Sequence, residues 1–139
     1  MKNLMLLLIV VLFTACTKKQ IGTKKCPDRA CTEIFASVTV KFVNGSGEGV
    51  VVKNYSAVNL RTNDTIKTSA GAAWNVAPGF YIVVDDGSTK KLSEAGDDIK
   101  VSGTDTVSNQ TKTAIIKVAG GKCACHITKI SGPEEIQFD

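Results

Sequence analysis

The chain has 139 residues, of which 43% are hydrophobic and 22% are charged, and its formal net charge is +4. This length supports one domain with a hydrophobic core. The positive charge lies near the N-terminus, because residues 30–139 contain 11 Lys or Arg against 12 Asp or Glu (11 − 12 = −1). A near-neutral domain with few aromatic residues argues against nucleic acid as a partner.

The first sixteen residues have the pattern of an export signal. Lys2 precedes an unbroken apolar run, Leu4–Phe13, which is too short to span a bilayer and fits the hydrophobic region of a secretory signal. Small residues precede Cys16, and the segment resembles a bacterial lipoprotein signal. That resemblance implies removal of residues 1–15 and acylation of Cys16, so that lipid anchors the chain to a membrane. The alternative is an ordinary cleaved signal with an incidental cysteine.

Residues 16–31 form the predicted tether, and residues 32–139 form the predicted domain. The tether is rich in lysine and has no hydrophobic periodicity. Beside an acylated cysteine it would lie against anionic headgroups, each charge contributing roughly 1 kcal/mol near such a surface. The alternative is a merely solvated linker.

Beyond the tether, the chain is predicted to consist of short strands separated by turns. The clearest period-two alternation runs over Ile34–Val43 and ends at the glycine-rich turn 44–49. Phe80–Val84 is apolar at every position, which predicts a central strand covered on both faces. Lys90–Ala95 offers one helical turn at best. The other expected strands are Val50–Val52, Tyr55–Arg61, Thr65–Ser69, Ile99–Ser102, Thr113–Ala119, Ala124–Ile130 and Ile136–Phe138.

Short strands at this spacing, with no long helix between them, predict a single immunoglobulin-like all-β sandwich. We expect its core to combine the first alternating strand with the apolar strand and one aromatic residue before it. The predicted core residues are Val38, Val40, Phe42, Trp74, Phe80, Ile82 and Val84.

Residues 38–87 resemble the transthyretin-like, carboxypeptidase-regulatory-like β-sandwich modules. The resemblance is carried by a first strand, a glycine-rich turn, a strand ending in polar residues, and a Gly, aromatic, Pro-Gly-x-Tyr series. These pieces are Val38–Val43, Gly45–Gly49, Ala57–Asp64, Gly71, Trp74 and Pro78–Val84. The resemblance implies a mostly noncatalytic unit with a structural or binding role.

Four cysteines follow Cys16, and they lie at the two ends of the predicted domain. An even number in an exported protein predicts disulfides. An extended strand holds alternate Cα atoms near the upper limit for a bridge, which disfavours Cys123–Cys125 and therefore Cys26–Cys31. We expect Cys26 and Cys31 each to pair with one of Cys123 and Cys125. The sequence does not choose between the two crossed arrangements.

The segment Cys123-Ala124-Cys125-His126 also suggests a metal site. Thiolates and an imidazole are ligands for zinc or copper, and His126 is the only histidine in the chain. In a strand the two cysteines would project from one face and His126 from the other, so a joint site requires a turn. The metal site is therefore an alternative to the disulfides.

Acidic residues cluster along the sequence between the predicted strands, but they lack the spacing of a calcium-binding loop. We expect them in solvated turns. These residues are Asp85, Asp86, Glu94, Asp97 and Asp98. The chain also lacks the sequence signatures of a serine-hydrolase elbow or a zinc protease.

These features predict a noncatalytic lipoprotein of a bacterial cell envelope that acts as a structural or binding module without a cofactor. Its expected partners are the membrane, through lipid at Cys16, and an envelope protein or a glycan. Thr17, rather than Asp, follows the cysteine, which by resemblance to Gram-negative sorting favours the outer membrane, facing the periplasm. The alternative function is copper or zinc handling by Cys123, Cys125 and His126.

Overall fold

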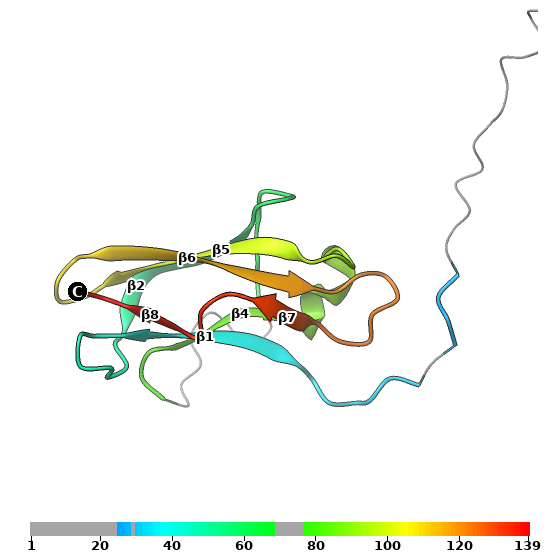
Figure 1. Cartoon of the computed structure of the whole chain (residues 1–139), viewed down its shortest axis with the longest axis horizontal. Helices are drawn as coiled ribbons and strands as arrows, with labels where there is room; N and C mark the ends of the chain where they lie inside the picture. The colour runs from blue at the N-terminus through cyan, green and yellow to red at the C-terminus, as the bar shows by residue number, and fades with distance from the viewer. Residues whose placement is uncertain (1–24, 29, 69–76) are drawn as a thin grey trace, which may run out of the picture.

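Two β-sheets pack face to face in the computed structural model, which describes residues 25–28, 30–68 and 77–139 (Figure 1). One sheet has the strand order β4-β1-β8 and the other the order β3-β2-β5-β6-β7. The elements are β1 (Ser37–Val43), β2 (Val52–Asn59), β3 (Asp64–Thr65), β4 (Phe80–Asp85), the 3₁₀ helix η1 (Asp86–Lys91), β5 (Asp97–Asp105), β6 (Thr111–Ala119), β7 (Thr128–Ser131) and β8 (Glu135–Gln137). The predicted all-β sandwich is confirmed.

Strand β1 is the middle strand of the smaller sheet, and its alternation is the one expected from the sequence. Val38, Val40 and Phe42 are buried in the core. The Phe42 ring is fully buried and contacts the rings of Tyr55, Tyr81 and Phe138 at centroid distances of 5.5–6.3 Å. Such aromatic contacts stabilise beyond the area that they bury.

Strand β1 begins later than the alternation predicts. Ile34 and Phe35 precede it and are 74% and 61% exposed. The Ala36 backbone pairs with Asp86, donating to its carboxylate and accepting from its N–H, so the chain is held here by one residue instead of a partner strand. The strand predicted from the alternation is therefore three residues too long at its beginning.

Strand β4 is covered on both faces as expected, but it is an edge strand of the described sheet and not a central one. The prediction for Phe80 is wrong, because this side chain is only half-buried. Ile82 is buried as expected but lies outside the main core cluster, to which Tyr81 and Val83 belong. The pairing with β1 shifts register at Val83, so Val84 also reaches the core. A β-bulge of this kind changes which side chains face inward. Trp74, also expected in the core, lies outside the described residues.

The larger sheet contributes the opposite wall of the core. Its strand β2 is one continuous element where the sequence predicted two, with an irregular register between Lys53 and Ser56. On β5, Gly103 leaves room for Phe42, since a Cβ at this position would lie 2.8 Å from the Phe42 ring. The inward side chains of β5 and β6 are Ile99, Val101, Ile116 and Val118, all fully buried.

The helical segment and the late strand also differ from expectation. Helix η1 lies at Asp86–Lys91, immediately after β4, and overlaps the predicted helical turn Lys90–Ala95 only at Lys90 and Lys91. The Asp85 side chain caps the helix by accepting from the Gly87 N–H. Strand β7 is shorter than predicted, because the chain before Thr128 forms turns. These turns place the cysteines of the C-terminal half beside η1.

The burial pattern makes a direct comparison possible between two phenylalanines. Phe42→Ala should lower the free energy of unfolding by about 3–5 kcal/mol, the usual cost of deleting a fully buried aromatic side chain. Phe80→Ala should cost clearly less, because Phe80 is half-buried on the other face of its strand. Urea denaturation of both variants measures the difference. Equal losses would contradict the assignment of Phe80 outside the core.

Candidate functional site

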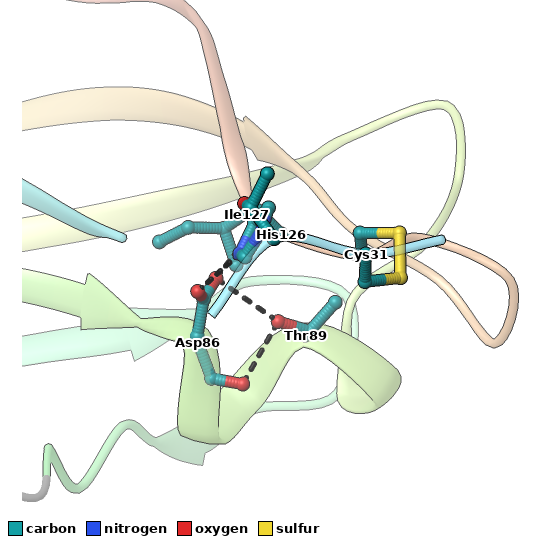
Figure 2. The surroundings of a disulfide bond; sticks show 7 residues. Cys31, Asp86, Thr89, His126 and Ile127 are labelled. Carbon is teal, nitrogen blue, oxygen red and sulfur yellow. Dashed lines mark hydrogen bonds and ion pairs between the residues drawn. A yellow bond between two sulfur atoms is a disulfide. The ribbon is translucent and has the colours of Figure 1, made fainter. Parts of the chain in front are cut away.

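A pair of disulfides, which we call the clasp, joins the segment before β1 to the turns between β6 and β7. Cys26 is bonded to Cys123 and Cys31 to Cys125, across sequence separations of 97 and 94 residues. The prediction that each early cysteine pairs with a late one is confirmed, and the structure selects between the two crossed arrangements. Figure 2 shows the bridge at Cys31 beside helix η1.

One premise of that prediction is wrong. Cys123 and Cys125 lie in turns between β6 and β7, not on an extended strand. The turns are packed against η1, with the Gly120 N–H donating to Ser93 O and the Gly121 N–H donating to Thr89 O. Each early cysteine nevertheless pairs with a late one, because the turns bring Cys123 and Cys125 to the segment that precedes β1.

Asp86, the first residue of η1, connects three segments of the chain. Its carboxylate accepts from the Ala36 N–H at 2.8 Å, just before β1, and from the Ile127 N–H at 2.9 Å, just before β7. The same carboxylate lies 2.7 Å from Nδ1 of His126. Figure 2 shows His126, Ile127 and Thr89 arranged around it. We call these contacts the Asp86 network.

The other imidazole nitrogen continues this network to the segment beside the clasp. Nε2 of His126 lies 2.8 Å from the Thr32 hydroxyl oxygen. When Nδ1 donates its proton to Asp86, Nε2 is left to accept the hydroxyl proton of Thr32. Residues 30–36, which we call the strap, are thus held at Cys31, Thr32 and Ala36.

The Asp86 network favours the charged form of the carboxylate. Burial alone would raise the pKa of Asp86, but hydrogen bonds from the Ala36 N–H, His126 and the Ile127 N–H outweigh it and lower the pKa below the usual value. The carboxylate is therefore ionised over the neutral range, where it can accept from all three donors.

The order hydroxyl, imidazole, carboxylate is also the order found in nucleophilic catalysis. Here the carboxylate additionally accepts two backbone N–H groups, and the Thr32 side chain lies on the exposed strap. A groove of about 520 Å³ lies elsewhere, between the end of β2, β3 and η1, lined among others by Asn59, Lys67 and Ser88. Thr32, Asp86 and His126 lie outside the lining of this groove.

The metal alternative does not fit this structure. Cys123 and Cys125 form disulfides and provide no thiolate, while both ring nitrogens of His126 face protein groups. In the described part of the chain, no group of three or more His, Cys, Asp or Glu side chains could hold a metal ion.

The clustered acidic residues do not converge on one site either. Asp97 is buried and accepts two hydrogen bonds from Arg61, at 2.7 and 2.8 Å. These bonds, with help from Asn59 and Ser93, hold the pKa of the Asp97 carboxyl well below its usual range despite burial. Asp98 is exposed beside Lys117. The expectation of solvated turns is therefore wrong for Asp97 and for Asp85, which are buried in β5 and at the end of β4.

Sequence reasoning singled out His126 and the cysteines but missed Thr32 and Asp86 as partners of the imidazole. Their separations from His126 are 94 and 40 residues, and no local motif links them. The one signal in the sequence was the predicted pairing of Cys31 with either Cys123 or Cys125, because both cysteines lie within three residues of His126.

The exact connectivity predicts a distinct fragmentation pattern. Trypsin acting on denatured, unreduced protein should leave residues 26–29, 30–41 and 123–129 as one linked species, since cleavage follows lysine and arginine. Tandem mass spectrometry that breaks the chain at Ala124 should find residues 26–29 on the Cys123 fragment and residues 30–41 on the Cys125 fragment. The reverse assignment would contradict the structure.

The Asp86 network predicts an acid-sensitive contribution to stability. The pKa of Asp86 is lower in the folded state than the unfolded value of about 3.9, so its contribution is present above about pH 4 and is lost as the pH falls through the folded pKa. Asp86→Asn should lower the free energy of unfolding at neutral pH by about 1–3 kcal/mol, because Asn keeps one acceptor oxygen and the N–H group of Ala36 or of Ile127 loses its acceptor.

Urea denaturation of disulfide-intact protein across the acidic range tests this. The free energy of unfolding should fall less steeply for Asp86→Asn than for the wild type as acid is added. Asp98→Asn is the matched control, since that side chain is exposed on β5. Parallel profiles for the wild type and Asp86→Asn would show that Asp86 is not an acid-sensitive group.

No helix in residues 25–28, 30–68 and 77–139 is long and apolar enough to span a membrane. Two residues of the expected transthyretin-like pattern, Gly71 and Trp74, lie outside the described residues. Comparison with known proteins found no match to this chain among family models, curated proteins or solved structures.

Proposed function

We propose that the chain is a lipid-anchored, noncatalytic module of a bacterial cell envelope, with a structural or binding role. The observation that carries the proposal is the clasp, which lies where the chain passes from the expected anchor into the domain. Two disulfides close to the surface persist in an oxidising compartment outside the cytoplasm. Export through the N-terminal signal, with acylation of Cys16, accounts for that compartment.

The distribution of charge supports a membrane at the N-terminal side. Residues 17–25 contain four lysines and no acidic residue, while the domain from residue 30 onward has a formal charge near zero. Lysines beside an acylated cysteine add electrostatic attraction to anionic headgroups. Thr17 after the cysteine favours the outer membrane, with the domain in the periplasm.

A binding or structural role agrees with how the polar residues of the candidate site are used. Asp86 and His126 are bonded to the strap and to the start of β7, so both side chains are used to hold the fold together. The finer assignment to transthyretin-like modules, drawn from residues 38–87, also implies an accessory unit. The groove between β2, β3 and η1 has hydroxyl, amide and lysine groups suited to an envelope protein or glycan.

The lipid anchor can be tested by replacing one residue. Cys16→Ala should move the protein from the membrane fraction to the soluble fraction and abolish labelling by a radioactive fatty acid. Cys26→Ser with Cys123→Ser is the matched control, because it removes cysteines without touching the acylation site. A Cys16→Ala protein that stays in membranes would refute the anchor.

A further inference from the structure

The clasp determines where a pull on the N-terminal tether enters the domain. Residue 26 is the first point at which the described chain is covalently tied to another part of the fold. Tension arriving from earlier residues therefore passes through the Cys26–Cys123 bond to the turns that follow β6. The strap and β1 lie outside this path (Figure 1).

Without the clasp, the same tension would reach the beginning of β1 once the hydrogen bonds of Thr32 with His126 and of Ala36 with Asp86 had broken. There Ser37 and Val38 are paired only with β4, because β8 pairs with β1 farther along, at Lys41–Val43. Tension at the end of a strand with one neighbour breaks its hydrogen bonds one after another. Since β1 provides Val38, Val40 and Phe42 to the core, its loss would open the sandwich.

The end of β6, to which the clasp transfers the tension, is held by more hydrogen-bonded neighbours than the beginning of β1. The last residues of β6 pair with β5 on one side and with β7 on the other, including Val118 with both Asp97 and Lys129. In the following turn, the Gly121 N–H donates to Thr89 O in η1, and the Gly120 N–H donates to Ser93 O just after this helix. A Cβ on Gly120 would lie 2.5 Å from Thr89 O, which shows how closely turn and helix approach.

We propose that the clasp is a mechanical bypass, which transfers tension from the tether to the end of β6 and keeps it off the strap and β1. The second bridge, Cys31–Cys125, lies behind the first and provides the same transfer when the first is absent. The source of tension, a membrane anchor, rests on the function proposed above. The bypass itself depends only on the described contacts.

Cutting the strap tests whether the tether is attached to the domain through the clasp and not through the strap and β1. A protease recognition sequence is inserted between Glu33 and Ile34, which are both exposed. The protein is a Cys16→Ala chain with a biotin acceptor tag after residue 16, held on streptavidin beads, so that the result does not depend on lipid. After cleavage the domain should remain on the beads, and dithiothreitol should then release nearly all of it.

Two controls fix the interpretation. The same recognition sequence placed after Gln20, before Cys26 and Cys31, should release the domain without reductant. Cys26→Ser with Cys31→Ser, combined with the strap site, should do the same. Release of the strap-cut, oxidised domain without reductant would overturn the proposal, whereas repetition with acylated protein in membranes tests the anchor separately.

Single-molecule stretching tests whether β1 is protected. The second handle is inserted at Val107, an 87% exposed residue in the turn at the opposite end of β6. In oxidised protein, tension spans only residues 107–123 (123 − 107 = 16), about 55 Å when extended; after reduction it spans residues 26–107 (107 − 26 = 81), about 280 Å.

One core substitution is made in the segment that carries tension after reduction, and one in the segment that carries tension in the oxidised protein. Val38→Ala, at the beginning of β1, should lower the unfolding force of the reduced protein and leave that of the oxidised protein unchanged. Val118→Ala, at the end of β6, should lower the force of the oxidised protein. An equal effect of Val38→Ala in both redox states would show that β1 carries tension despite the clasp.

Discussion

The covalent connection between the segment before β1 and the turns after β6 is the constraint on which the arrangement of this chain depends. In the chain-entropy description, a bridge closing a loop of about 100 residues stabilises a fold by up to about 4.7 kcal/mol. In the folded state, however, the clasp also orders the strap, whose residues are mostly exposed and contribute little to the core. Ordering the backbone of each residue costs about 1–2 kcal/mol, so a few strap residues offset much of that gain. The main consequence of the clasp is therefore positional, since it fixes the place at which the tether leaves the domain.

The Asp86 network complements the clasp without duplicating it. The disulfides hold the strap at Cys31 and before it, whereas the carboxylate holds its other end at Ala36 and, through Ile127, the start of β7. A buried carboxylate is costly unless hydrogen bonds satisfy it, and Asp86 meets this requirement with three donors from two segments, before β1 and before β7. Asp97 does so with Arg61 and Asn59. Among the described residues, no buried side-chain nitrogen or oxygen lacks a partner.

The fold class and the clasp could be predicted from the sequence because both depend on simple rules. Alternation places Val38, Val40 and Phe42 inward, and the number and placement of cysteines in an exported chain indicate bridges between its ends. The inward face of β4 could not be predicted, since every residue of Phe80–Val84 is apolar and a bulge opposite β1 changes the alternation. The Asp86 network also could not be predicted from the sequence. Its donors lie 40 to 50 residues away in sequence, and only the folded sandwich brings them together.

The two bridges differ in what they do, although they lie side by side. Tension in the tether reaches Cys26–Cys123 first. While this bridge is intact, it alone determines where the tether is attached to the domain. Cys31–Cys125 lies closer to Thr32 and His126, so it sets the geometry of the Asp86 network. Loss of the first bridge should leave that network in place and move the attachment by only a few residues. Loss of the second should free the strap between Cys26 and Ala36 while the tether stays attached at Cys123. One disulfide would suffice for attachment, and the second connects attachment to the polar contacts that hold β1 in place.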